Sequence, residues 1–312
     1  MEDYPKSLID FESRFKTDEE CRKYLENIRW PEGFRCPRCA STSSWTKANG
    51  LHICRQCSLQ TSVITGTIFQ DTKKPLNVWF LAMWHITSQK YGANALGIQR
   101  ILGLGSYRTA WAWLHKLRRA MVRPGRDKLS GVVHVDETFI GGTTSGKRGR
   151  GADGKSLVLV VAQEDGQKVG RIRLSVISDA SAATLTTMLA LLVEPGTLIK
   201  TDGWPGYNDL ETSGFHHQIL RQEATIGEDL LPHCHRVASL LKRWLLGTHQ
   251  GAVRSENLQY YLDEFTFRFN RRTSSSRGKL FFRLVQQAVL LDPVPLTSLK
   301  STKKSQTTIG SV

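Results

Sequence analysis

The chain has 312 residues, of which 40% are hydrophobic, and a formal net charge of +15. This length is sufficient for two or three domains with proper cores, and no apolar run approaches the roughly 20 residues that a membrane helix needs. The first residues lack the basic start and apolar stretch of a signal peptide, so we expect a cytoplasmic protein without a membrane partner. The excess of Lys and Arg over Asp and Glu favours an anionic polymer as partner, most often nucleic acid.

Residues 1–30 have the pattern of a short helical lead-in, in which Thr17 and Glu20 are spaced as a capping box. Residues 31–70 contain two Cys-x-x-Cys pairs with fourteen residues between them. In a cytosolic chain such pairs are more often metal ligands than disulfides. Four thiolates at this spacing predict a closed, tetrahedral zinc site that stabilises a zinc ribbon and has no catalytic role. The four ligands are Cys36, Cys39, Cys54 and Cys57.

Residues 75–122 have the pattern of a helix-turn-helix. Two amphipathic segments flank the turn at 103–105, and the second begins after Ser106, a favourable N-cap. Arg108, His115 and Arg119 lie opposite the apolar face, where a recognition helix would meet a DNA groove. A helical pair without DNA contact is the alternative, because small pairs of this shape are common.

From residue 131 to 292 the pattern changes to strand, strand, strand, helix, strand, followed by further helices. The first strand carries Asp136 among Val and Ile, and the fourth ends in Asp202. Carboxylates are depleted in strands and costly to bury. This order predicts an α/β fold with a ribonuclease-H-like core, a mixed sheet flanked by helices. In that core the first and fourth strands are neighbours, which would bring Asp136 and Asp202 together.

Adjacent carboxylates repel each other unless a cation bridges them, and hard oxygen ligands suit Mg²⁺ or Mn²⁺. Two such ions would activate a water or a 3′-hydroxyl for in-line phosphoryl transfer. The helix that follows Pro232 carries His235 and Lys242 on one polar face, two turns apart. For each of these two residues, a solvated helix position is the alternative.

Two further basic segments are expected to contact DNA phosphates. One is the glycine-rich loop after the first strand, for which a plain solvated loop is the alternative. The other ends the helix expected at 255–272. Residues 279–291 would form a last helix, and the polar segment 293–312 a disordered tail. The basic residues concerned are Lys147, Arg148, Arg150, Arg268, Arg271 and Arg272.

Three segments resemble the zinc-ribbon DDE transposases of bacterial insertion sequences, relatives of the eukaryotic Merlin elements. They are HVDETFIGG at 134–142, TDGW at 201–204, and the block from LLKRW at 240–244 to FRFNRR at 267–272. The resemblance extends from the four-cysteine ribbon to about residue 292. It implies a bacterial, nucleoid-associated enzyme that nicks DNA at terminal inverted repeats and joins the ends to target DNA. It also implies a homo-oligomer, because two DNA ends must be held together.

Within this resemblance, Asp136 and Asp202 occupy the first two metal-ligand positions. Much of the family has Glu or Asn as its third residue, seven positions before a lysine on the same helix. Here Lys242 matches the lysine, and His235 stands seven positions before it. We therefore expect an Asp-Asp-His site that favours Mn²⁺ over Mg²⁺, with Lys242 on a DNA phosphate.

Glu223 and Glu228, in the loop before this helix, are the alternative third carboxylates. Glu137 is adjacent to the first aspartate but should point to the other face of the sheet, so we leave it out. An inactive, decayed copy is the alternative to a branch that uses histidine. Two other functions stay open, namely a non-catalytic DNA-binding protein and a nuclease of the same fold without strand transfer.

Overall fold

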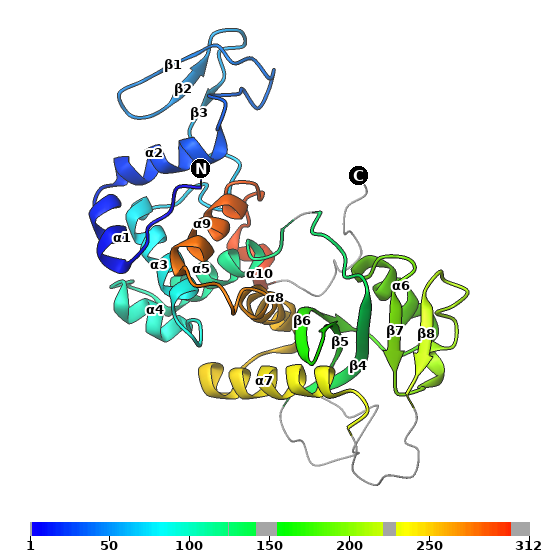
Figure 1. Ribbon diagram of the computed structural model, residues 1–312. Coiled ribbons are helices and arrows are strands. Elements are labelled where there is room, and N and C mark those ends of the chain that lie inside the picture. Colours follow the sequence, from blue (N-terminus) through cyan, green and yellow to red (C-terminus); the bar gives the residue numbers. More distant parts are fainter. Residues whose placement is uncertain (1, 124, 142–154, 221–228, 301–312) are drawn as a thin grey trace. The chain divides into compact units, whose positions relative to one another are not determined.

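The computed structural model describes residues 2–123, 125–141, 155–220 and 229–300. The chain forms two compact units (Figure 1). The first comprises Met1–Arg123 and the C-terminal segment Thr273–Val312, and the second comprises Pro124–Arg272. Within the described ranges, every helix is too short or too polar to span a bilayer.

The first unit is helical apart from its small ribbon. The capping box is formed, since Thr17 Oγ1 accepts a hydrogen bond from the Glu20 amide (3.2 Å) and Glu20 Oε2 accepts one from the Thr17 amide (2.8 Å). The helical lead-in expected at residues 1–30 forms two helices. The helices of this unit are α1 (Leu8–Arg14), α2 (Asp18–Arg29), α3 (Leu76–Ser88), α4 (Ala95–Ile101), α5 (Tyr107–Arg119), α9 (Arg277–Ala288) and α10 (Leu296–Lys300). The ribbon is an antiparallel sheet of β1 (Ser44–Thr46), β2 (His52–Cys54) and β3 (Gln60–Thr61).

Helix α9 belongs to the first unit, whereas the sequence analysis placed its residues in the catalytic domain. It packs against α3 and α2. Phe281 of α9 lies 5.3 Å from Phe11 and 5.5 Å from Phe80 between ring centroids, so the C-terminal segment completes an aromatic core begun by the first helices. Part of the expected disordered tail needs correction, because α10 is helical and its Leu299 is buried, whereas residues 301–312 lie outside the described range.

The second unit contains a five-stranded mixed sheet in the order β6-β5-β4-β7-β8. Strands β4, β5 and β6 are antiparallel neighbours, whereas β7 runs parallel to β4 and β8 runs parallel to β7. This is the topology of a ribonuclease-H-like core, and it confirms the predicted fold class. The strands are β4 (Val132–Ile140), β5 (Ser156–Asp165), β6 (Lys168–Ile177), β7 (Leu198–Thr201) and β8 (His216–Ile219).

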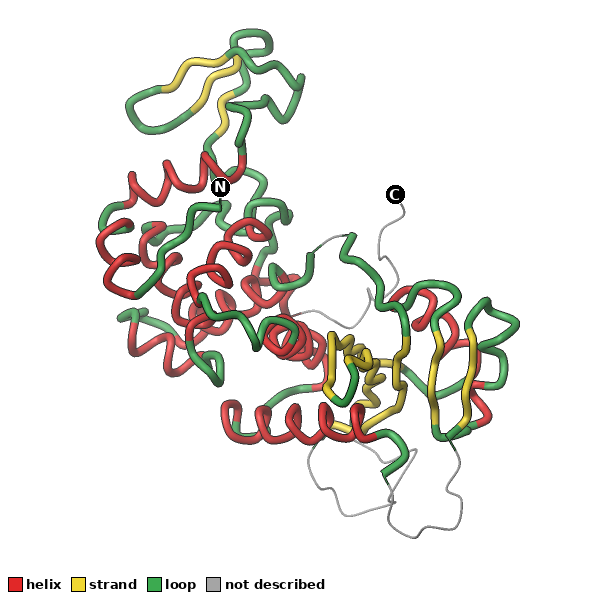
Figure 2. Tube along the Cα trace, in the orientation of Figure 1, coloured by secondary structure: helices red, strands yellow, loops and turns green. Residues whose placement is uncertain are grey.

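Helices cover both faces of this sheet (Figures 1 and 2). Because side chains alternate along a strand, odd-numbered β4 residues such as Val133 and Val135 share a core with α6, while even-numbered β5 residues share another with α7. Asp136 therefore faces α7 and Glu137 faces the opposite side, where it accepts a hydrogen bond from Tyr207. The helical elements are α6 (Ala182–Leu192), η1 (Pro205–Tyr207), α7 (Pro232–His249), η2 (Ser255–Asn257) and α8 (Leu258–Phe269).

Helix α8 covers the open edge of the sheet at β6. The Gln259 side chain accepts a hydrogen bond from the Val176 amide (2.9 Å) and donates one to the Leu174 carbonyl (3.3 Å). Its amide group thus takes the place of a neighbouring strand. Unpaired edge groups are a template for unwanted strand addition, so this cover also protects the sheet from aggregation.

Candidate functional site

Two acidic residues meet on the central pair of parallel strands. The β4–β7 ladder includes the pair His134 and Lys200, and Asp136 and Asp202 each lie two residues further along. The Asp136 side chain is 20% exposed, whereas Asp202 follows the last residue of β7 and is exposed. The strand order thus brings together the two carboxylates that the sequence predicted as partners.

Burial raises the pKa of Asp136 above its usual value, and the negative charge of Asp202 acts in the same direction. The Glu137 amide and the His235 ring oppose this rise without cancelling it. A carboxylate with a raised pKa beside a second carboxylate gains stability from a bound cation. The donor set is thus suited to a divalent metal ion.

Helix α7 places a histidine over this pair. Pro232 occupies the first turn, where its missing N–H costs nothing, and Val237, Leu241 and Trp244 anchor the helix on the sheet. His235 Nε2 lies 3.2 Å from Asp136 Oδ2. Lys242 is exposed on the same helix, seven residues and about 10.5 Å further along its axis.

Asp229 is a contributor that the sequence analysis missed. Its Oδ1 lies 2.5 Å from His235 Nδ1, so the imidazole lies between the two carboxylates of Asp229 and Asp136. The residue stands in a segment interpreted as a loop, six positions before His235. The available signal was an acidic residue three positions before the start of a helix, where carboxylates are favoured.

A second layer of polar side chains lies two residues before Asp136 on β4 and two residues before Asp202 on β7. Glu164 Oε2 accepts hydrogen bonds from Lys200 Nζ (2.8 Å) and His134 Nε2 (3.1 Å). The ring centroid of His134 is 4.5 Å from that of His233 on α7. Burial lowers the pKa of His134, so a neutral ring is favoured there. Because Lys200 and His134 each precede a candidate ligand by two residues, this layer ties the acidic strands together.

The four cysteines lie on two matching turns of the ribbon. Ala40 and Ser58, each directly after a Cys-x-x-Cys pair, have left-handed backbones with φ of 59° and 58°. The amide of each donates to the carbonyl of the first cysteine of its pair, at 2.9 Å for Cys36 and 3.0 Å for Cys54. The two pairs therefore form equivalent knuckles.

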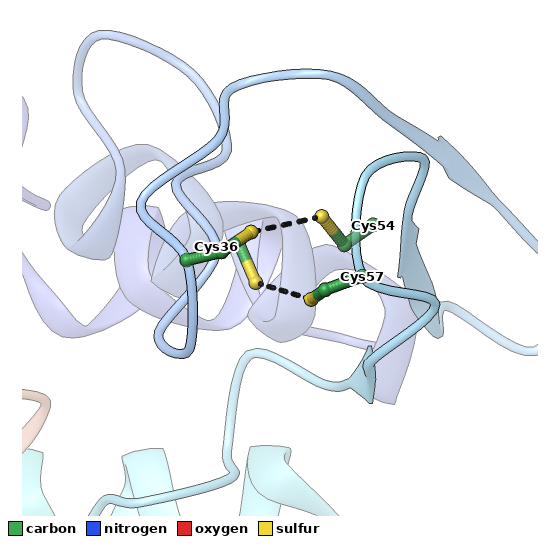
Figure 3. A group of neighbouring side chains, drawn as sticks. Cys36, Cys54 and Cys57 are labelled. Atoms are coloured by element: carbon green, nitrogen blue, oxygen red, sulfur yellow. Dashed lines mark hydrogen bonds between the residues drawn. The ribbon is translucent and has the colours of Figure 1, made fainter.

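The cysteine sulfurs have the spacing of a zinc site. Cys36 Sγ is 3.6 Å from Cys57 Sγ, and Cys39 Sγ is 3.5 Å from Cys54 Sγ. Figure 3 shows the labelled side chains directed toward one another. A zinc tetrahedron with Zn–S bonds of about 2.3 Å has S–S edges of about 3.8 Å. A hydrogen bond from the Cys57 backbone lowers the pKa of Cys54 to about 6, which favours the thiolate that binds metal.

Among the described residues, this cysteine group alone brings three or more ligand atoms within 4.8 Å of one another. The set of Asp136, Asp202 and His235 is wider.

The helix-turn-helix pair is present, with α4 packed on α5 and Gly103 in the turn at φ 58°. Arg108 and Arg119 are exposed. The expectation that His115 faces outward is wrong, because it is fully buried with its ring centroid 4.1 Å from that of Trp111. Helix α5 contacts α10 as well as α4, so more of its surface is covered than two helices alone would cover.

The arginines at the C-terminal end of α8 make contacts with other residues of the second unit. Arg268 lies 3.4 Å from the buried carboxylate of Glu264, and Arg271 donates to the Phe267 carbonyl (3.1 Å). Arg272 donates to the carbonyl of Gly170 on β6 (3.3 Å). Arg268 and Arg271 are half-buried and Arg272 is exposed, so the expected DNA contact of these three arginines stays a prediction. Other residues expected to bind DNA or to be the third carboxylate lie outside the described ranges. They are Lys147, Arg148, Arg150, Glu223 and Glu228.

Comparison with protein families gives two matches. Residues 128–270 match the ISXO2-like transposase domain, and residues 16–60 match the transposase zinc-ribbon domain. The chain belongs to the zinc-ribbon DDE transposases of insertion sequences. The first match includes every residue of the acidic site on β4, β7 and α7, and the second includes all four cysteines.

One relative of this transposase is an uncharacterized protein in the transposable element ISH50 of Halobacterium salinarum. It is 25% identical over 299 residues, which cover 88% of this chain and 98% of the relative. Two solved structures match with low TM-scores. The pre-cleavage Mos1 transpososome has a TM-score of 0.29 at 13% identity and covers 71% of this chain and 79% of its own. The Mos1 strand transfer complex has a TM-score of 0.26 at 14% identity and covers 71% and 78%.

Proposed function

We propose that this transposase cuts DNA at the ends of its insertion sequence and joins those ends to target DNA. Phosphoryl transfer takes place at Asp136, Asp202 and His235. The observation that carries the proposal is the meeting of two carboxylates on parallel neighbours β4 and β7, with the His235 ring 3.2 Å from Asp136. This arrangement joins three residues that are far apart in the sequence.

Asp136, Asp202 and His235 would hold Mg²⁺ or Mn²⁺, which supplies Lewis acidity toward the phosphate and lowers the pKa of a bound nucleophile. Asp136 is mostly buried, while the exposed Asp202 is accessible to the approaching DNA. Lys242 binds a backbone phosphate further along α7 and so orients the DNA strand. The His235 ligand favours Mn²⁺ over Mg²⁺.

DNA recognition is assigned to the helix-turn-helix region, residues 75–122, with Arg108 and Arg119 on the duplex. Both side chains are exposed on α5, and the net charge of +15 supplies the attraction to phosphate. A homo-oligomer on the DNA follows from the need to hold two ends at once. The zinc ribbon, residues 31–70, stabilises the start of the chain through its Zn²⁺ site.

The test is an assay with linear DNA carrying the flanking repeats, a supercoiled target plasmid and Mn²⁺. Wild-type protein should give nicked and joined products. Asp136→Asn and Asp202→Asn should lose both products, while Asp209→Asn, at an exposed position of the same unit, should keep them. Joined products from Asp136→Asn would refute the proposed site.

The same assay separates the alternatives. Cleaved but unjoined ends from wild-type protein would show a nuclease of the same fold. Repeat-specific binding without any cleavage in Mn²⁺ or Mg²⁺ would show a DNA-binding protein or a decayed copy. Either result would replace the proposal.

A further inference from the structure

The His235 ring is held from both sides by carboxylates. Its Nδ1 lies 2.5 Å from Asp229 Oδ1, and its Nε2 lies 3.2 Å from Asp136 Oδ2. We propose that Asp229 is the positioning residue of the third metal-ligand position, where it fixes the His235 ring and supplies the negative charge that a histidine lacks. This inference rests on the proposed function, in which His235 is a ligand.

The need for a positioning group follows from exposure. The His235 side chain is 54% exposed and that of Asp229 is 46% exposed, so core packing does not hold either group. A half-exposed imidazole can rotate about its side-chain bonds unless a hydrogen bond restrains it. The contact of 2.5 Å with Asp229 is the shorter of the two and provides that restraint.

Asp229 is itself anchored. Its Oδ1 also accepts a hydrogen bond from the Leu231 amide at 3.2 Å, directly before the first residue of α7. A carboxylate at this end of an 18-residue helix is stabilised by the helix dipole. The Asp229 carboxylate is therefore fixed by backbone that moves together with His235.

The chemistry of the ring explains what this restraint achieves. A neutral imidazole has one donor nitrogen and one acceptor nitrogen. When Nδ1–H donates to Asp229, the lone pair of Nε2 is left on the side of Asp136, where the metal ion would lie. Metal-ligating histidines commonly give their other N–H to a carboxylate in this way, which also makes the ring a stronger ligand.

The pair also balances charge. Glutamate at the third position brings one negative charge to the metal, and a neutral histidine brings none. With a neutral ring, an ionised Asp229 and His235 would together carry one negative charge, which matches the net charge of a carboxylate ligand. The histidine at this position is thus compatible with a functional site.

The experiment measures Mn²⁺ affinity of the zinc-loaded full-length protein by electron paramagnetic resonance and calorimetry. Asp229→Asn keeps an oxygen that can accept from the Leu231 amide, so the local backbone contact should remain, but it removes the charge that holds the His235 ring. We expect Mn²⁺ affinity to fall by about 10- to 100-fold, with little change in melting temperature. Asp209→Asn is the matched control and should bind Mn²⁺ as wild type does.

Two further variants, each with His235 replaced, distinguish a positioning role of Asp229 from a purely structural role. In His235→Ala, adding Asp229→Asn should cause no additional loss, because there is no ring to position. In His235→Glu, which supplies a carboxylate directly, Asp229→Asn should not weaken Mn²⁺ binding. An equal loss in all three backgrounds would overturn the inference, because it would show that Asp229 acts independently of the His235 ring.

Failure of the inference and failure of the proposed function give different results. If Asp136→Asn weakens Mn²⁺ binding and Asp229→Asn does not, the inference is wrong and the proposed site stands. If neither Asp136→Asn nor Asp202→Asn weakens binding, the proposed site is wrong, and the role of Asp229 is excluded with it.

Discussion

The Asn270 side chain pairs with the backbone of Ile172 through two hydrogen bonds. Its Oδ1 accepts from the Ile172 amide at 2.7 Å, and its Nδ2 donates to the Ile172 carbonyl at 3.1 Å. Ile172 lies in β6, the edge strand of the sheet, so one side chain provides both contacts that a further strand would make. Asn270, directly after α8, is thus a structural clamp on the sheet.

Replacing this clamp should destabilise the second unit. In Asn270→Ala the amide and carbonyl of Ile172 lose their partners, which should cost about 1–3 kcal/mol of unfolding free energy. Urea denaturation followed by circular dichroism measures the change. Asn208→Ala, at an exposed position of the same unit, is the control and should stay within about 0.5 kcal/mol of wild type. Equal effects of the two substitutions would contradict the assigned role of Asn270.

The pKa of Asp263 should make stability depend on pH. Burial raises this pKa from about 3.8 to about 6, against the opposing effects of the Gln259 hydrogen bond and the Arg126 charge. The folded state therefore binds more protons than the unfolded state in this range, and stability falls as pH rises from about 4 to about 6. Asp263→Asn should remove this loss and stabilise the protein by about 1–2 kcal/mol at pH 7.

Denaturation curves at pH 5 and pH 7 test the prediction for Asp263. The advantage of Asp263→Asn over wild type should grow between these two values. The exposed control Asp209→Asn should follow wild type at both. A constant difference across this range would show that Asp263 does not titrate there in the folded state.

Zinc should bind through the four ribbon cysteines alone. Cys54→Ser should lose the metal and make residues 31–61 sensitive to proteases, because the ribbon strands are only two or three residues long. Zinc content by atomic absorption and limited proteolysis measure both effects. Cys21→Ser is the matched control, since Cys21 is buried in α2 and burial raises its pKa to about 12, which keeps it a neutral thiol. Zinc loss from this control would contradict the assignment.

Lys242 should contribute one phosphate contact to DNA binding. Lys242→Ala should weaken binding to all sequences to a similar degree and lower the slope of log affinity against log salt by about 1. Fluorescence anisotropy over a salt series measures this slope. Arg243→Ala removes an adjacent exposed charge that points about 100° away around the helix, and it should change the slope less. The assignment fails if the Arg243 variant has the larger effect.

Several features could be predicted from local sequence because local chemistry determines them. Two Cys-x-x-Cys pairs predict matching knuckles, since each knuckle is built within five residues. The order of strands and helices predicts the sheet, and the sheet order then places Asp136 beside Asp202. Position along α7 similarly relates His235 to Lys242. These relations depend on periodicity and connection rules, which a single sequence contains.

Other features depend on contacts between distant segments, and only the tertiary structure decided them. His115 looked exposed on a two-helix surface, but α5 has further neighbours that the pattern of one helix does not reveal. Arg272, just after α8, found a partner only in the fold, because the Gly170 carbonyl of β6 is about 100 residues away in sequence. Asp229 gained its role only when folding placed His235 between it and Asp136. In each case composition and periodicity describe what a side chain can do, and the packing of remote segments selects which partner it meets.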